Sequence, residues 1–339
     1  MPNSLARERL ASLLRSAAGR RIAIVGDAML DVYLKGDVER ISPEAPVPVV
    51  RVRERVLALG GAANVAQNVA ALGAIPELVA LVGDDPAGTE LRRLLAGIGA
   101  GAGSLIPTSR PTTTKTRIQA RMQQVVRYDE EDDGDVGPAD TERALALADR
   151  ALAVADALII EDYNKGLLTP PVIERVIGIA RARGIPIVVD PKYRNFFCYG
   201  GATVFKPNRR ELEAALGAAV DVSRSDMLPE VVRRLGVEHV LLTLGELGMV
   251  LVARDGLVHR VPTTARGVYD VVGAGDTVTA YLAAMLAAGA SAREASVVAN
   301  FAAGVEVGKP GAATVTGDEV LAAYDSYGAS PGAGTTPRA

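Results

Sequence analysis

The chain has 339 residues, 49% of them hydrophobic, and a formal net charge of −3 at pH 7. This length is enough for one large α/β domain or two small ones. The weakly acidic balance, without a stripe of basic residues, argues against a nucleic-acid-binding protein, because affinity for a phosphate backbone comes from clustered Lys and Arg.

The single cysteine, Cys198, excludes an internal disulfide and a zinc site built from cysteines, which suits a reducing compartment. His239 and His259 have no acidic or cysteine partners at ligand spacing, and we expect neither to bind a metal.

Residues 1–20 lack the apolar core of a secretory signal, and no segment reaches the roughly 18 uninterrupted apolar residues of a membrane span. We therefore expect a cytoplasmic protein without a membrane partner.

The first predicted strand is Arg21–Gly26, a short apolar run that is followed by Asp27 and Asp31. An acid just beyond a central strand of an α/β protein lies where ligands bind, although a turn carboxylate is the simpler explanation of one such residue. Residues 33–52 contain three closely spaced prolines, which exclude a helix and favour an edge strand or an extended flap.

Gly60 and Gly61 lead into a predicted helix whose first turn holds Asn64, with Asn68 on the same face. The small residues either let a polar ligand approach or only allow close helix packing, and the sequence leaves both possibilities open. A strand over 77–83 and a helix over 86–96 follow. Residues 112–128 then alternate like a hairpin with a turn near 121–123, which suits a flap over a wet site.

From Pro138 onward, strands and helices alternate, which predicts a mainly parallel sheet. The expected elements are helix 138–154, strand 157–161, helix 170–183, strands 185–190 and 203–205, helix 208–216, strands 240–244 and 249–253, and helices 274–288, 292–307 and 317–327. Three strands end in polar residues, Glu161, Asp190 and Lys206, which we expect on one rim because the carboxyl ends of parallel strands line the ligand crevice. The tail 328–339 is predicted to be disordered.

The stretch Asp270–Thr277 precedes an apolar helix that is expected to be buried on nearly every face. The N–H groups of Gly273, Ala274 and Gly275 at such a helix start would receive an anion. Asp276 would repel that anion, unless it takes a proton from a group that attacks a phosphate. An acid stabilised only by the helix dipole is the alternative, and this stretch alone does not decide between them.

Taken together, these motifs resemble the ribokinase-like (PfkB) carbohydrate kinases over about residues 20–322. The chain is most similar to the D-glycero-β-D-manno-heptose 7-phosphate kinases, including the kinase half of the bifunctional heptose kinase/nucleotidyltransferase. The matching segments are 26–31, 40–49, 123–129, 162–166, 190–192, 207–211 and 307–311. The segment 40–49, Arg-Ile-Ser-Pro-Glu-Ala-Pro-Val-Pro-Val, discriminates best. Neither a Walker A motif nor Gly-x-Gly-x-x-Gly after the first strand occurs.

The resemblance implies an α/β ribokinase-like three-layer sandwich with a mainly parallel central sheet and a small β lid. Residues 1–20 would be an extension or helix, 21–322 the kinase domain, and the strands around 33–52 and 112–128 the lid. The lid edges could pair between two chains, so we expect a homodimer. The chain has no His-x-Gly-His motif, which predicts a stand-alone kinase.

The resemblance also implies a reaction, the ATP- and Mg²⁺-dependent phosphorylation of the C1 hydroxyl of heptose 7-phosphate on the way to ADP-heptose. Asp276 would be the general base, and the N–H groups of Gly273, Ala274 and Gly275 would hold the transferred phosphoryl. The substrate-binding residues would be Asp31, Gly60, Gly61, Asn64, Lys165 and Lys192. The nucleotide site would include Asn208, Glu211, Thr243, Gly245 and Gly248. No direct metal ligand is implied, because Mg²⁺ keeps several waters.

Two departures from the family pattern bear on the choice of sugar. Val271-Val272 precedes Gly273 where many relatives carry Thr or Ser, and Glu161 replaces a small residue. A ribokinase-like kinase of another sugar, sugar phosphate or nucleoside is therefore an alternative, and a non-catalytic sugar-binding protein on the same fold is a third hypothesis.

Overall fold

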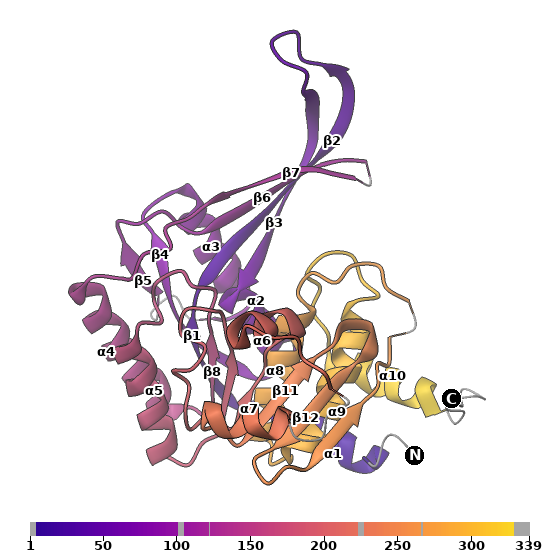
Figure 1. The fold of residues 1–339 in the computed structure, drawn as a ribbon. Coiled ribbons are helices and arrows are strands. Elements are labelled where there is room, and N and C mark those ends of the chain that lie inside the picture. The colour runs from indigo at the N-terminus through magenta and orange to yellow at the C-terminus, as the bar shows by residue number, and fades with distance from the viewer. Residues whose placement is uncertain (1–4, 101–104, 122, 223–226, 266, 329–339) are drawn as a thin grey trace.

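The computed structural model describes residues 5–100, 105–121, 123–222, 227–265 and 267–328 (Figure 1). Within this part of the chain, a nine-stranded sheet is covered by helices on both faces, and a four-stranded sheet projects from it. The described chain is thus an α/β three-layer sandwich with a lid, as the sequence predicts.

Along the chain, the α-helices are α1 (Arg7–Ala17), α2 (Ala62–Ala71), α3 (Pro86–Gly97), α4 (Pro138–Val154), α5 (Pro170–Ala182), α6 (Arg209–Leu216), α7 (Met227–Leu235), α8 (Ala274–Ala287), α9 (Ala292–Glu306) and α10 (Gly317–Gly328). The strands are β1 (Arg21–Gly26), β2 (Ala28–Ile41), β3 (Pro48–Gly61), β4 (Ile75–Gly83), β5 (Leu105–Thr108), β6 (Thr114–Ala120), β7 (Gln123–Glu130), β8 (Ala157–Glu161), β9 (Ile187–Asp190), β10 (Val204–Phe205), β11 (His239–Thr243), β12 (Met249–Ala253) and β13 (Val258–Val261).

The large sheet has the order β13-β12-β11-β10-β9-β8-β1-β4-β5, and only its β11–β12 and β12–β13 pairs are antiparallel. Alternate residues of β1 serve opposite faces: Ile22 and Ile24 belong to the core under α2, α8 and α9, whereas Ala23 and Val25 belong to the core under α4 and α5. Because both faces are buried, the parallel strands are continuous apolar runs.

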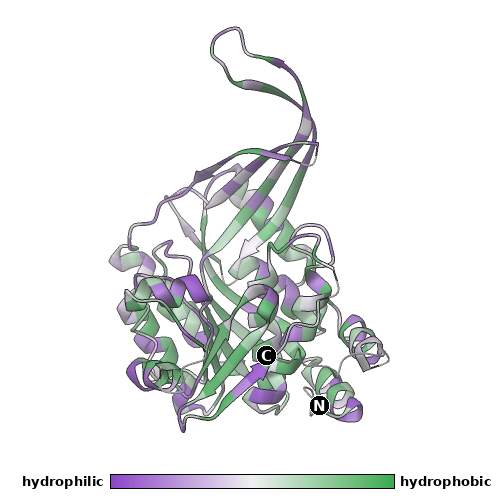
Figure 2. Cartoon of the chain, turned by 45° about the vertical axis from the view of Figure 1, so that its right-hand side comes forward, coloured by the Kyte–Doolittle hydropathy of each residue, from purple (hydrophilic) through white to green (hydrophobic). Residues whose placement is uncertain are grey.

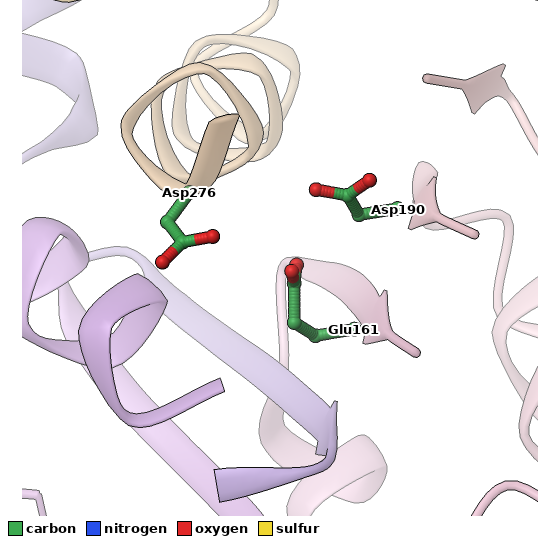
Figure 3. A group of neighbouring side chains, drawn as sticks. All are labelled: Glu161, Asp190 and Asp276. Atoms are coloured by element: carbon green, nitrogen blue, oxygen red, sulfur yellow. The ribbon is translucent and has the colours of Figure 1, made fainter. Parts of the chain in front are cut away.

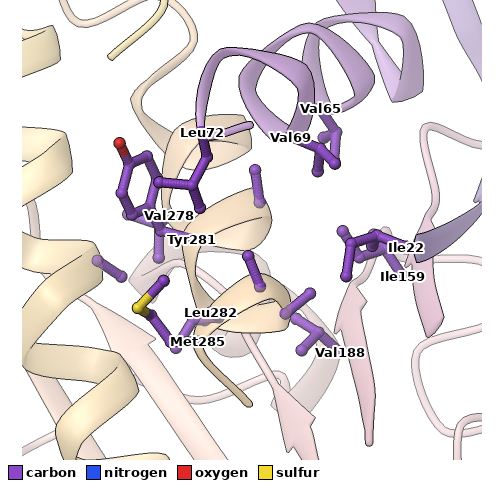
Figure 4. Packing of buried hydrophobic residues seen from close by; sticks show 14 of the residues in the cluster. Ile22, Val65, Val69, Leu72, Ile159, Val188, Val278, Tyr281, Leu282 and Met285 are labelled. Carbon is purple, nitrogen blue, oxygen red and sulfur yellow. The ribbon is translucent and has the colours of Figure 1, made fainter. Parts of the chain in front are cut away.

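Helix α8 is the centre of the first core. Its side chains from Val278 to Met285 are buried, and Tyr281 donates a hydrogen bond to the carbonyl of Val315 at 3.0 Å. Figure 4 shows this helix between α2, which carries Val65 and Val69, and the sheet. The burial explains why the helix is apolar on nearly every face, and it fixes the helix N-terminus at the carboxyl edge of the strands.

The smaller sheet has the order β3-β2-β6-β7 and forms the lid. Its base is buried, as at Met29 and Leu30, but the end of the β2–β3 ribbon reaches far beyond the body, and Ile41 there is 61% exposed (Figures 1 and 2). The β6–β7 hairpin turns at Arg121, which has a φ of 56°, as the prediction of a turn near 121–123 requires.

Most predicted elements are found within two residues of their expected bounds, but five features were not foreseen. β2 starts at Ala28 and β3 ends at Gly61, so both extend beyond the predicted segment 33–52. Asp31 therefore lies inside a strand rather than in a loop, because β2 pairs with β3 on one side and with β6 on the other. β5 and β13 are only four residues long, and α7 contains Pro229, so none has a clear periodic pattern. The predicted disorder of the tail concerns residues that lie outside the described ranges, apart from Gly328 at the end of α10.

In the part of the chain that the structure describes, no helix is both long enough and apolar enough to cross a bilayer.

The contact between β1 and β8 gives a test of the central sheet. A Cβ added at Gly26 would lie 2.2 Å from the carbonyl oxygen of Glu161, so we expect Gly26→Ala to lower the free energy of unfolding by about 1–3 kcal/mol. Urea unfolding followed by circular dichroism measures it. Gly178→Ala is the control, because nothing lies within 4 Å of its Cβ, and it should stabilise α5 by about 0.5–1 kcal/mol. Equal stability of the Gly26→Ala and wild-type proteins would contradict this packing.

Candidate active site

The N-terminus of α8 is open to a ligand. Gly273, the residue before the helix, has a φ of 95°, a conformation that favours glycine. A Cβ here would meet the Asn64 amide nitrogen at 3.1 Å, and a Cβ at Gly275 would lie 3.6 Å from the Lys206 ammonium. The first-turn N–H groups have no partners within the helix, and such a helix start favours an anion.

Asp276 lies in the first turn of α8 and is 6% exposed. Its Oδ2 accepts a hydrogen bond from the Asn64 side chain at 2.7 Å, and its Oδ1 accepts one from the Tyr163 hydroxyl at 3.0 Å. Burial raises the pKa of Asp276 to about 6, against the lowering effect of the Asn64 hydrogen bond. The carboxylate is thus ionised at neutral pH, is held in one orientation, and is basic enough to accept a proton.

A row of ionisable residues lies at the carboxyl edge of the sheet beside Asp276. Glu161 of β8 pairs in register with Asp190 of β9, and the ammonium of Lys206, just after β10, lies 2.7 Å from Asp190. Oxygen atoms of Glu161, Asp190 and Asp276 all lie within 4.8 Å of one another, and Figure 3 shows the three carboxylates facing a common point. Although burial acts to lower it, the neighbouring carboxylates raise the pKa of Lys206, which keeps its charge.

The loop after β8 holds Tyr163 in place. The buried Asp27 accepts hydrogen bonds from the backbone N–H groups of Tyr163 at 2.8 Å and Lys165 at 3.0 Å. Asp162 in turn binds the N–H of Asn164, which has a φ of 55°. Burial raises the pKa of Asp27 to about 6. This buried acid therefore has a structural explanation, because it fixes the loop that aims the Tyr163 hydroxyl.

The predicted sugar-binding residues of the lid base are brought together. Asp31 is buried and pairs with Arg117 at 2.6 Å, and a Cβ at Gly60 would lie 2.8 Å from the Asp31 carboxylate. Gly61, with a φ of 55°, begins α2 and so leads to Asn64 and Asp276. Asp31 thus lies beside Gly60, and the following residue leads into the helix whose Asn64 binds Asp276.

The two lysines predicted to bind substrate lie in different surroundings. Lys165 pairs with Glu131 at 2.8 Å, whereas Lys192 pairs with Glu211 and lies over the Tyr163 ring, 5.0 Å from its centre. Lys192 therefore joins a residue of the predicted nucleotide set to the tyrosine that binds Asp276.

The predicted nucleotide-binding residues form a second group. Asn208 and Glu211 cap α6 reciprocally, with both hydrogen bonds at 2.9 Å, and Asn208 bridges to Thr243. Gly245 and Gly248 have φ values of 60° and 85° in the turn between β11 and β12. Gly248 also has a packing explanation, because a Cβ there would lie 2.2 Å from the carbonyl oxygen of Val261.

An open cavity of about 210 Å³ lies beyond this turn, against α9 and α10. It is lined by Thr264, Gly267, Phe301, Gly304, Val305, Gly308, Ala323 and Ser326. Its lining is uncharged and mostly small, with the hydroxyl residues Thr264 and Ser326 beside apolar ones. It was not predicted from the sequence, because its residues come from separate elements.

From the sequence, Glu161, Asp190 and Lys206 were expected on one rim but without a role in a site, and Tyr163 was assigned none either. The position of Glu161 and Asp190 at the ends of neighbouring strands was the available signal. The contact of Tyr163 with Asp276 had no such signal, because the two residues lie 113 positions apart.

Comparison with known proteins adds the family context. Residues 20–318 match the family described as "pfkB family carbohydrate kinase". The chain is 44% identical over 319 residues to the bifunctional protein HldE of Rhodospirillum rubrum, covering 93% of this chain and 64% of that protein. It is also 44% identical over 330 residues to the bifunctional protein HldE of Caulobacter vibrioides, covering 95% and 67%. The chain thus spans about two thirds of the length of these relatives.

Solved structures show the same fold. Arabidopsis thaliana ribokinase complexed with ribose and ATP superposes with a TM-score of 0.71 at 20% identity, over 90% of this chain and 98% of that one. Phosphofructokinase-2 from Escherichia coli in complex with substrates and products gives a TM-score of 0.74 at 20% identity, over 91% and 99%. The fold is therefore ribokinase-like.

The hydrogen bond from Tyr163 to Asp276 predicts a measurable change in the carboxyl group. Removing a donor to the charged form should raise the pKa of Asp276 from about 6 by about one further unit in Tyr163→Phe. Carbon-13 NMR titration of aspartate-labelled protein reports it. Tyr128→Phe, on the exposed lid strand β7, should leave the titration unchanged. An unchanged pKa in Tyr163→Phe would mean that the hydroxyl does not bind Asp276 in solution.

Proposed function

The chain belongs to the PfkB family of carbohydrate kinases, and from this premise we propose that it phosphorylates the C1 hydroxyl of D-glycero-D-manno-heptose 7-phosphate with ATP. The product would be the 1,7-bisphosphate, a cytoplasmic precursor of ADP-heptose. Support for the sugar comes from the segment 40–49, which resembles the heptose 7-phosphate kinases, and from 44% identity to HldE proteins. The observation that carries the proposed chemistry is a buried, oriented carboxylate directly beside an open helix N-terminus.

Asp276 acts as the general base. The sugar hydroxyl approaches between the lid base and α2, gives its proton to the Asp276 carboxylate, and attacks the terminal phosphorus of ATP as the proton leaves. Asn64 and Tyr163 hold the carboxylate in place, and its pKa of about 6 keeps it ionised yet basic at neutral pH. Asp31 and the backbone at Gly60 and Gly61 hold the remaining hydroxyls.

The N–H groups of Gly273, Ala274 and Gly275 stabilise the charge on the transferred phosphoryl, and one preorganised donor of this kind is worth about 2.7–4 kcal/mol. The ammonium of Lys206, close to the backbone of Gly275, adds positive charge on the same side. Backbone N–H groups beside an ammonium are the donors that phosphates require, so the residues present fit ATP.

The nucleotide would be held along the second group of residues. Lys192, Asn208 and Glu211 lie at the phosphate end, Thr243 and Gly245 follow, and the cavity of about 210 Å³ offers room for the base. Glu211, at the rim, would hold Mg²⁺ through water, since this ion keeps most of its waters, and Mg²⁺ would supply charge neutralisation at the phosphates.

The decisive experiment compares substrates. We expect ADP release with heptose 7-phosphate to exceed release with ribose, fructose 1-phosphate, fructose 6-phosphate and adenosine by at least about tenfold in kcat/KM, since a site built for polar groups rejects analogues that lack them. Phosphorus NMR should show a new anomeric phosphate. Greater activity on another substrate of the panel would mean that the proposed substrate is wrong, but it would still support the proposed kinase chemistry.

Asp276→Asn is the matched control for the chemistry in that assay. It should lower kcat by about 10²–10⁴-fold, because the amide accepts no proton. The variant should unfold at the same temperature as the wild type or higher, because a buried charge is removed. An active Asp276→Asn protein would support the hypothesis of a different base, and ADP formation by neither protein would support a non-catalytic binding protein.

The lid offers the surface for a homodimer, which we propose to form between the lids of two copies. β7 is an edge strand and is exposed along nearly its whole length, with Val126 46% and Tyr128 47% exposed. Exposed apolar residues on an unpaired strand edge favour pairing with a second copy.

Light scattering tests this association. The wild type should have the mass of two chains, and Val126→Lys should shift it towards one chain by placing a charge in the apolar contact. Val154→Lys, at an equally exposed position on α4, should remain dimeric. A wild-type protein with the mass of one chain would refute the proposal.

A further inference from the structure

Glu161 is a buried acid that the proposed reaction does not use. It ends β8, its exposed fraction is 0%, and neither of its carboxyl oxygens has a hydrogen-bond donor among the described residues. Gly26 of β1 packs directly against it, so close that an added Cβ would lie 2.8 Å from the Glu161 Cβ. This close packing on the β1 side turns the carboxyl group towards α8 and β9.

The groups that face Glu161 come from every element around it. Asp190 lies beside it on β9, Asp276 faces it from α8, and the two nearby cations are Lys206 after β10 and Lys192 after β9. Tyr163, on the loop that follows β8, completes the surroundings. Glu161 thus faces two carboxylates, and among the described residues neither lysine donates a hydrogen bond to it.

Both cations already have carboxylate partners. Lys206 pairs with Asp190 at 2.7 Å, and Lys192 pairs with Glu211. Asp276 is ionised and accepts two hydrogen bonds from neutral groups, Asn64 and Tyr163. A second anion at Glu161 would therefore be buried without compensation, next to two others, and such a group keeps its proton instead.

We propose that Glu161 is a positioning residue, held as the neutral acid, whose O–H faces the carboxylates of Asp190 and Asp276. As a neutral group it places no third negative charge between these two carboxylates, and its O–H can donate to one of them. Burial raises the pKa of the Glu161 carboxyl well above its ordinary value, in agreement with this state. The effect on catalysis rests on the proposed function, but the protonation state does not.

A neutral Glu161 settles which acid takes the proton of the substrate. Glu161 keeps its own proton and so accepts none, and Asp190 is paired with Lys206, which leaves Asp276 as the acceptor. An ionised Glu161 would repel the incoming phosphates and raise the proton affinity of Asp276. The neutral acid does neither, and it helps to keep the Asp276 carboxylate where Asn64 and Tyr163 hold it.

The first test is carbon-13 NMR of glutamate-labelled protein without ligands at pH 7.5. The Glu161 signal, identified by its loss in Glu161→Gln, should have the shift of a protonated carboxyl. Glu306→Gln is the control, because burial also raises the pKa of Glu306, to about 8, and this variant should keep the Glu161 signal. An ionised Glu161 signal would overturn the proposal, whatever sugar the protein phosphorylates.

The second test is kinetic. Glu161→Gln keeps a neutral donor of the same shape, so its kcat should stay within about threefold of the wild-type value, and the acidic side of its pH–rate profile should be unchanged. In Glu161→Ala, kcat should fall by more than about tenfold. A Gln variant as impaired as the Ala variant would overturn the proposal. Binding of Mn²⁺ alone can be followed by electron paramagnetic resonance. If the wild type binds Mn²⁺ and Glu161→Gln does not, the proposal is also overturned, because a metal ligand must be ionised. Equal Mn²⁺ affinity of both proteins supports it.

Discussion

A carboxylate buried at the start of a buried helix is the constraint on which the site depends. Asp276 can accept a proton only if it is both desolvated and held, and α8 meets the first condition because its side chains are covered by α2, α9 and the sheet. Asn64 and Tyr163 meet the second. In the proposed mechanism the same helix also presents its N–H groups to a phosphate, so that one element would bring the base and the anion site together at a fixed separation.

The sheet supplies the rest of the site through its register. Glu161 and Asp190 are neighbours because β8 and β9 pair in parallel, and Lys206 joins them because β10 continues the same row. Their charges then depend on one another. Lys206 compensates the charge of Asp190, and the adjacent Glu161 is left without a cation of its own. A parallel sheet that ends in polar residues therefore sets the positions of the groups beneath α8, and in our proposal it also sets which of them holds a proton.

The fold and the start of α8 could be predicted from the sequence because their signals are local. Glycines followed by an acid and an apolar run predicted the start of α8, and alternating strand and helix patterns predicted the parallel sheet. The contacts of Tyr163 with Asp276 and of Lys192 with Glu211 could not be predicted, since they depend on how separate loops meet in three dimensions. Asp31 was expected in a loop for a related reason: its partner Arg117 lies on a strand that follows 86 residues later.

The proposed mechanism requires that the transfer take place at the N-terminus of α8. A crystal structure of the protein with heptose 7-phosphate and a non-hydrolysable ATP analogue tests this most directly. We expect the terminal phosphate against the N–H groups of Gly273, Ala274 and Gly275, and one sugar hydroxyl within hydrogen-bond distance of Asp276. A terminal phosphate bound away from these glycines, or a sugar with no hydroxyl in reach of Asp276, would contradict the mechanism.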